Sequence, residues 1–228
     1  MKNIFRFLAK HKLAILAAIC CLVVQAYCDL ALPTYTSDVL NVGLQQGGIA
    51  DGVMDTVRAD SLETLELFMT DADTQTVEQA YTQPNASGVR TLRDDADRET
   101  LNNILRKPEA TVYQMRSSDK TKGAPEQIKA AVAAGAMTKE QLISQMDEAF
   151  SKMGDMTDTF LTEIAVNYVS AEYQAQGIDL NQVRNAYLFA VGGKMLLMAV
   201  IMAIAAILVG LIASVTSSKV GRDLRTSI

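Results

Sequence analysis

The chain has 228 residues, a net charge of −5 and 49% hydrophobic residues. Its one histidine, His11, lies close to the N-terminus, so the rest of the chain cannot supply a Ser–His or Cys–His catalytic pair or a histidine-based metal cluster. The hydrophobic residues are concentrated in two blocks, 13–32 and 187–215, with polar sequence between them.

Both apolar blocks are long enough to cross a membrane. A helix needs about 20 mainly apolar residues to span the hydrocarbon core, and the stretch 195–215 contains no charged residue. A core helix of a soluble protein rarely stays so apolar on all sides. We therefore predict a mainly α membrane protein with two transmembrane helices and a mostly helical extracytoplasmic domain between them.

The basic residues that flank the blocks predict the orientation. Four bases and no acid precede the first block, and Lys219, Arg222 and Arg225 accompany Asp223 after the second. Since basic flanks stay on the cytoplasmic side, we expect a plasma-membrane protein with both termini cytoplasmic and residues 33–186 outside. This outer region has nearly two acids for every base, which argues against binding to nucleic acid.

In chain order, the sequence predicts five segments. They are a basic cytoplasmic or interfacial segment at 1–12, a transmembrane helix at 13–32 that extends outward to about 48, an extracytoplasmic helical domain at 49–180, a second transmembrane helix at 187–215, and the start of a cytoplasmic loop at 216–228. An alternative is a cleaved signal peptide, because a basic start, an apolar core and Ala26 resemble one. Such a peptide could be cleaved after Cys28. Against cleavage, "DLALP" (29–33) continues the apolar segment beyond Cys28.

Within the outer region, helical patterns dominate. Asp60 and Glu63 have the spacing of a capping box, and residues 96–105 form a second short helical pattern. Gly135 is expected to divide 125–153 into two helices, the second starting at Thr138. Gly177 is expected to end a helix over 156–177, and Asp179 or Asn181 to cap the next one. Residues 110–115, "ATVYQM", are the one candidate strand.

The chain offers little that predicts catalysis. Its three cysteines all lie in the first block, and their spacing without a histidine does not suit tetrahedral zinc. The segment "VGGKML" at 191–196 lacks the upstream glycine and the Ser or Thr of a phosphate-binding loop. We expect no catalytic residue, metal site or cofactor site in this chain, and whether it belongs to an enzyme stays open.

Charged and polar residues inside an apolar block are more informative, because an ionisable group within a membrane is costly. Asp29 and Lys194 both lie toward the predicted outer ends of the spans. They could form a pair or two solvated ends at the outer interface, where Lys194 can extend outward. Alternatively, they could line a polar substrate pathway with Gln25, one turn below Asp29.

Two segments resemble one known family. After the acidic Asp29, "LALPTYTSDVLNVGLQQGG" (30–48) is similar to the end of the first span and its outer extension in bacterial ATP-binding cassette exporters of the multidrug and lipid type. The matching residues are Leu32, Pro33, Ser37, Asp38, Val39, Asn41, Gly43 and Gly48. The second block, together with the residues that follow it up to "GRDLR" (221–225), resembles the second span of that family as it leads into the first cytoplasmic coupling loop.

The resemblance covers 1–48 and 187–228 and implies an ATP-driven permease that moves a small amphipathic, drug-like or lipid substrate outward. It implies Arg222, Asp223 and Arg225 near the coupling loop, ATP and Mg²⁺ bound elsewhere in the full transporter, and as partners the lipid bilayer, a second half-transporter and a nucleotide-binding domain. Family members usually join these helices by a short loop, and they carry four more spans. We therefore expect this chain to be an N-terminal fragment, a split gene product or a trimmed piece.

A two-span receptor with an outer sensing domain fits the same layout. Such a sensor would continue from the second span into a signalling helix pair, whereas an exporter would continue into a coupling loop and a third span. The sequence alone leaves both interpretations open.

Overall fold

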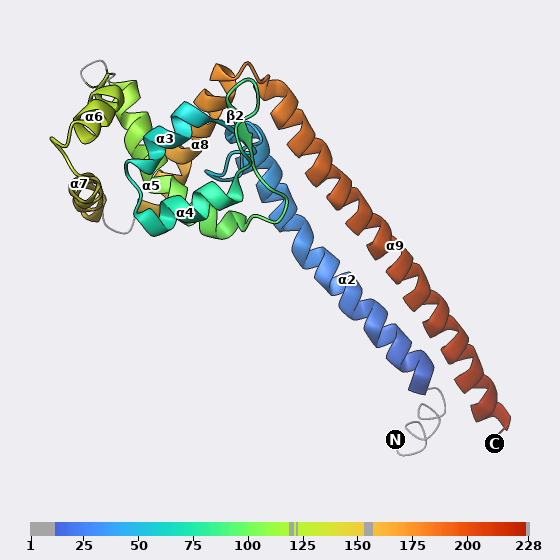
Figure 1. Ribbon diagram of the computed structural model, residues 1–228. Helices are drawn as coiled ribbons and strands as arrows, with labels where there is room; N and C mark the ends of the chain where they lie inside the picture. The colour runs from blue at the N-terminus through green and yellow to red at the C-terminus, as the bar shows by residue number, and fades with distance from the viewer. Residues whose placement is uncertain (1–11, 119–120, 122, 153–156, 227–228) are drawn as a thin grey trace. The chain divides into compact units, whose positions relative to one another are not determined.

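The computed structural model describes residues 12–118, 121, 123–152 and 157–226. The predicted basic segment at 1–12 therefore lies almost wholly outside the described residues. The chain divides into two compact units, Met1–Asn41 with Tyr187–Ile228, and Val42–Ala186. The structure is mainly α, with two long apolar helices and a helical region between them in the sequence (Figure 1).

The first unit is built from α2 (Lys12–Asp38) and from α9 (Leu180–Thr226), which begins in the second unit. Both helices are long and apolar enough to cross a membrane. The helix α2 continues through Pro33, which removes one backbone donor. A π-helical segment, η1 (Val39–Gln45), follows it directly, so the chain stays helical up to the turn at Gly47 and Gly48.

Most apolar side chains of α2 and α9 are exposed. Leu13, Leu30 and Leu196 each leave more than two thirds of their surface uncovered. Cys28 is an exception at 2% exposure, and its thiol lies 3.8 Å from the thioether sulfur of Met198 in α9. Apolar surface of this extent is unfavourable in water and is typical of helices that are covered by lipid or by other helices.

The second unit has six helices and a short hairpin among its described residues, besides the first residues of α9. Its helices are α3 (Ala59–Glu66), α4 (Asp71–Ala80), α5 (Arg98–Ser117), α6 (Ala124–Ala133), α7 (Lys139–Ser151) and α8 (Thr157–Ala175). The strands β1 (Thr56–Arg58) and β2 (Val89–Thr91) pair antiparallel, with Val57 opposite Arg90.

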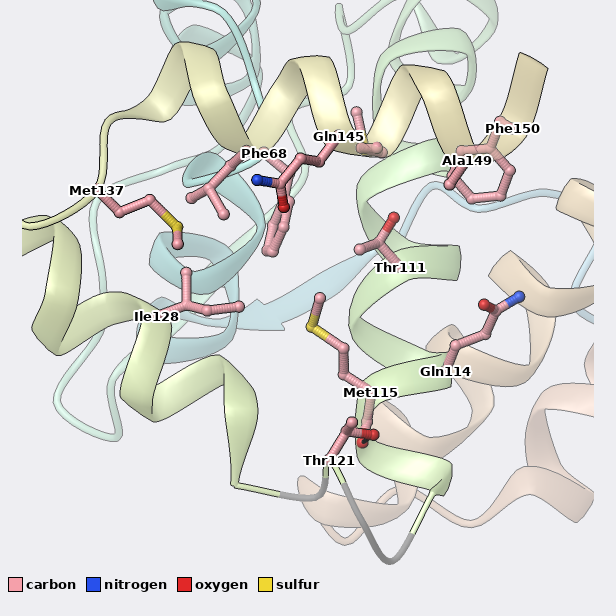
Figure 2. A pocket seen from close by; sticks show the side chains of 12 residues that line it. Phe68, Thr111, Gln114, Met115, Thr121, Ile128, Met137, Gln145, Ala149 and Phe150 are labelled. Atoms are coloured by element: carbon pink, nitrogen blue, oxygen red, sulfur yellow. Dashed lines mark hydrogen bonds between the residues drawn. The ribbon is translucent and has the colours of Figure 1, made fainter. Parts of the chain in front are cut away.

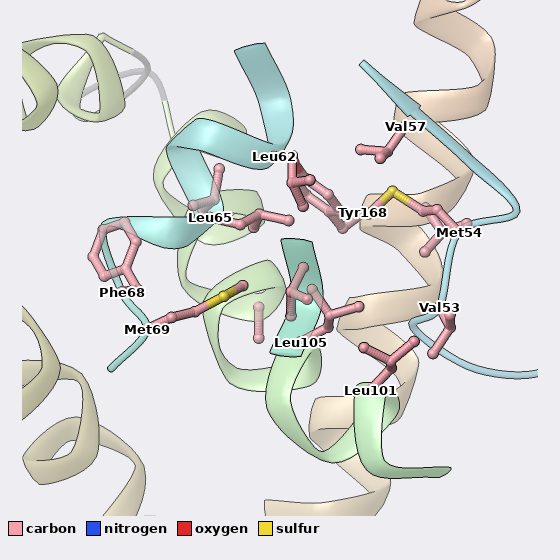
Figure 3. Packing of buried hydrophobic residues seen from close by; sticks show 14 of the residues in the cluster. Val53, Met54, Val57, Leu62, Leu65, Phe68, Met69, Leu101, Leu105 and Tyr168 are labelled. Carbon is pink, nitrogen blue, oxygen red and sulfur yellow. The ribbon is translucent and has the colours of Figure 1, made fainter. Parts of the chain in front are cut away.

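The core of this unit lies where α3 and α8 pack against α5. Leu62 and Leu65 of α3, Leu101 and Leu105 of α5, and Tyr168 of α8 are each at most 2% exposed. Figure 3 shows these side chains converging, with Val53 and Met54 from the segment before β1 beside them. Burying a leucine of this kind contributes about 2 kcal/mol, so the second unit has a substantial core of its own.

Several predicted boundaries are confirmed. Gly135 adopts φ 70° after α6, and Thr138 caps α7 in a capping box with Gln141. Gly177 adopts φ 78° after α8. Asp179 caps α9 by accepting a hydrogen bond from the backbone N–H of Asn181 at 2.9 Å.

Two predictions are wrong. Residues 110–115 are not a strand but part of α5, which passes through Pro108 and reaches Ser117. The helical spacing from Leu105 to Val112 places both against the core, and this packing outweighs the strand preference of the segment. Asp60 does not cap α3, because the helix already begins at Ala59 and Asp60 lies in its first turn.

Candidate functional sites

The polar residues of the two apolar helices were the first predicted site. Gln25 is partly buried in α2, whereas Asp29 and Lys194 are exposed. No hydrogen bond or ion pair joins these three side chains in the part of the chain that the structure describes. Their function, as an outer-interface pair or as part of a polar pathway, stays a prediction.

The residues predicted to approach the coupling loop lie at the end of α9. Arg222 is exposed on this helix, and the side chains of Asp223 and Arg225 lie outside the described residues. The segment at 191–196 lies within α9, so its glycines, Gly192 and Gly193, are helical. A helix interior uses its backbone N–H groups internally, which does not suit a phosphate-binding loop.

In the second unit, Glu172 of α8 is a buried carboxylate that accepts hydrogen bonds from several donors. Its oxygens accept hydrogen bonds from the Arg58 backbone N–H, Nε and Nη2 at 3.0, 2.9 and 2.8 Å, from Ser61 Oγ at 2.8 Å, and from Gln176 Nε2 at 3.2 Å. Burial alone would raise the pKa of Glu172, but the bonds from Arg58 and Ser61 hold this pKa below its ordinary value. This network joins β1 and α3 to α8.

Glu109 of α5 is the opposite case. It is 0% exposed, and neither carboxyl oxygen has a hydrogen-bond partner. Burial, with a smaller contribution from the Asp51 carboxylate, raises the pKa of Glu109 well above its ordinary value. Its carboxyl lies against Gly52, where a Cβ atom would overlap it. We infer that Glu109 is protonated at neutral pH, since an unpaired buried charge is strongly unfavourable.

These two glutamates do not form a catalytic pair. No nucleophile–base arrangement accompanies them, and no group of His, Cys, Asp or Glu side chains suited to a metal ion is found among the described residues. Glu172 is satisfied by its structural partners, and Glu109 is closed off from solvent.

The second unit also contains a cavity of about 480 Å³ between α5, α6 and α7. Figure 2 shows Ile128 and Met115 facing the side chains of α7 across this space, with Phe68 beside them. Its wall is mostly apolar and includes the methionines Met115, Met137 and Met146. A cavity of this size lies within the range of small-molecule binding sites.

Ion pairs connect α6 and α7, which line this cavity, to neighbouring helices. Lys107 Nζ of α5 lies 2.7 Å from the carboxylate of Asp147 in α7, and Lys129 Nζ of α6 lies 2.6 Å from that of Glu63 in α3. All four side chains are partly exposed, so each pair contributes up to about 1 kcal/mol. They therefore contribute little to the stability of this unit.

Sequence reasoning missed the cavity. A signal was present in α7, where Leu142, Met146 and Phe150 recur every four residues and are all buried. That spacing predicts one narrow apolar face, but it does not reveal that the face lines a space instead of packing closely. Only the placement of α6 and α7 around α5 shows this.

No family model, curated protein or solved structure matches this chain in the comparisons made.

Proposed function

We propose that this chain is a permease segment of an ATP-driven exporter, the first two spans of its transmembrane domain with a large extracytoplasmic domain inserted between them. It would lie in the plasma membrane with both termini cytoplasmic and residues 33–186 outside. Its substrate would be a small amphipathic, drug-like or lipid molecule that moves outward.

The observation that carries the proposal is the helical extension beyond the first span. The segment that resembles the exporter motif, from Asp29 to Gly48, continues as helix through Pro33 and ends at two glycines with positive φ. At Gly48 the chain meets the start of α9, where a Cβ atom would come within 2.7 Å of the Arg184 Cα. This close approach brings the end of the extension next to the residues that lead into α9.

The exposure of α2 and α9 supports the same proposal. Their apolar faces are left open by this chain, as expected for two spans of a larger bundle that also contacts lipid. The partners would be the bilayer, a second half-transporter, identical or not, and a nucleotide-binding domain below "GRDLR". ATP and Mg²⁺ would bind to that domain, as the resemblance to the exporter family implies.

The test is ATP hydrolysis by the assembly that contains this chain. We would purify the chain with an N-terminal affinity tag from its native membranes in mild detergent and measure vanadate-sensitive ATPase activity. The proposal expects such activity, and it expects the double charge reversal Arg222→Glu with Arg225→Glu to lower it at least fivefold. The exposed Arg93→Glu variant in the outer unit is the matched control and should retain the activity.

Two results would contradict the proposal. The first is an intact assembly without vanadate-sensitive hydrolysis. The second is hydrolysis that the Arg222 and Arg225 reversal leaves unchanged. A copurifying signalling helix pair, in place of a cassette, would favour the two-span sensor instead.

A further inference from the structure

We propose that the cavity between α5, α6 and α7 is a binding site for an uncharged amphiphile, a molecule with an apolar chain or ring and a neutral polar head. The proposal concerns the outer domain alone and holds whether the spans belong to an exporter or to a sensor.

The first argument is the absence of charge. No Lys, Arg, Asp or Glu side chain lines the cavity among the described residues, although charged residues make up 21% of the sequence. The charged partners nearby, Lys107 and Asp147, neutralise each other. A charged ligand entering this cavity would lose its hydration without gaining a counter-charge, and this is strongly unfavourable.

The two threonine hydroxyls of the cavity wall already have hydrogen-bond partners within the protein. Thr111 Oγ1 donates to the Lys107 carbonyl at 2.9 Å, and Thr121 Oγ1 donates to the Met115 carbonyl at 2.8 Å. These hydroxyls are therefore satisfied within the protein and present little unmet hydrogen-bonding capacity. The interior of the cavity is suited to an apolar body.

The third argument concerns the two amides of the wall. Gln114 of α5 and Gln145 of α7 have no hydrogen-bond partner within the described part of the chain, and both reach solvent. An amide both donates and accepts hydrogen bonds. These side chains can thus bind a hydroxyl, ester or amide head at the opening while the apolar body lies inside.

The methionines suit such a ligand. Met115, Met137 and Met146 are unbranched and polarisable, so they adapt to apolar ligands of different shape. Figure 2 shows the side chains of Met115 and Met137 near Ile128 in this space. A site of this kind discriminates by polarity and size more than by exact shape.

The ligand could come from the membrane or from solution, and photolabelling distinguishes the two sources. One arm uses the full chain in nanodiscs that contain a diacylglycerol, an uncharged lipid of the bilayer, with a diazirine on its acyl chain. The other uses the same chain in nanodiscs of unmodified lipid with a free diazirine-bearing fatty alcohol added. After irradiation, mass spectrometry maps the labelled residues, so labelling of the spans is separated from labelling of the outer domain.

The proposal expects labels on the cavity faces of α5 and α7 in at least one arm. Ala149→Phe, which places a ring in the cavity wall, should lower this labelling at least fivefold. Ala130→Phe is the matched control, because Ala130 is exposed on α6 and does not line the cavity. It should leave the labelling within twofold of the parent chain.

Competition keeps the test independent of how the variants fold. An excess of unlabelled fatty alcohol should displace the label from the unaltered chain at least fivefold. Labelling in the lipid arm alone identifies an acyl chain of the membrane as the ligand, and labelling in the other arm alone identifies a dissolved amphiphile. The proposal is overturned if α5 and α7 stay unlabelled in both arms, or if neither the competitor nor Ala149→Phe reduces their labelling.

Discussion

Replacing Glu172 by glutamine should destabilise the second unit, Val42–Ala186, far more than the same replacement at Glu109. The two side chains are both buried, at 2% and 0% exposure, and the substitution is nearly isosteric at both. At position 172, however, the carboxylate accepts five hydrogen bonds, and three of them come from Arg58. At position 109 the carboxyl has no partner to lose.

The magnitude follows from the partners of Glu172. Removing one member of a buried ion pair costs about 3–5 kcal/mol. The Arg58 side chain is 33% exposed, so water can partly replace the lost carboxylate, and we expect the lower end, about 3 kcal/mol. For a unit of this size, each kcal/mol corresponds to roughly 2–4 °C in the unfolding midpoint. Glu172→Gln should therefore lower the midpoint by about 10 °C.

Thermal unfolding of the full chain in detergent, followed by near-ultraviolet circular dichroism, provides the assay. The protein has no tryptophan, and Tyr81, Tyr168 and Tyr173 are buried in the core of the second unit. The tyrosine signal therefore reports the packing of this core. Glu109→Gln at pH 7.5 should leave the midpoint unchanged or raise it. The reasoning fails if Glu172→Gln shifts the midpoint by less than about 2 °C, or if both variants lower it equally.

Three further predictions follow from the same structure. The folded pKa of Glu109 lies above its ordinary value of 4.5, so folding favours the protonated form. This residue should therefore lower the stability of the fold progressively as pH rises above about 4.5, until the folded pKa is passed. The unfolding midpoint of Glu109→Gln should exceed that of the parent increasingly from pH 5 to pH 8, and a constant difference would contradict this. Gly48→Ala combines positive φ with a backbone clash and should cost about 3 kcal/mol, whereas Gly47→Ala, with positive φ and open space, should cost about 1–2 kcal/mol; equal midpoints in thermal unfolding would refute the close approach. On a background without the native cysteines, Ser87→Cys should react with an impermeant maleimide on intact cells and Ser217→Cys only after permeabilisation, and the reverse pattern would exclude the proposed orientation.

The sequence predicted those elements whose signals are local. Gly135 and the capping box at Thr138 separate α6 from α7 within four residues of chain, and Gly177 ends α8 in the same local way. The short strands β1 and β2 were missed because each has three residues, which is too few for an alternating pattern. The strand expected at 110–115 was wrong because tertiary packing against α8 selects helix there.

The buried glutamates and the cavity could not be predicted, because both depend on contacts between distant residues. Arg58 and Glu172 are 114 positions apart, and nothing in the sequence near either of them indicates the other. In the same way, Glu109 resembles a solvated acid on a polar helix until Gly52 and α8 cover it. The exporter motif was identified by its resemblance to a known family and not by a physical pattern in the sequence. The function that it implies therefore stays a proposal.

The proposed function is tested most directly at the C-terminal end of α9. A photoreactive amino acid would replace Arg225 in the chain as it is expressed in its native membrane, and ultraviolet light would link it to its neighbour. We expect a crosslink to a nucleotide-binding domain. Mass spectrometry would identify this partner from peptides of a domain that carries a phosphate-binding loop. A crosslink to a signalling helix pair, with none to such a domain, would contradict the proposed function.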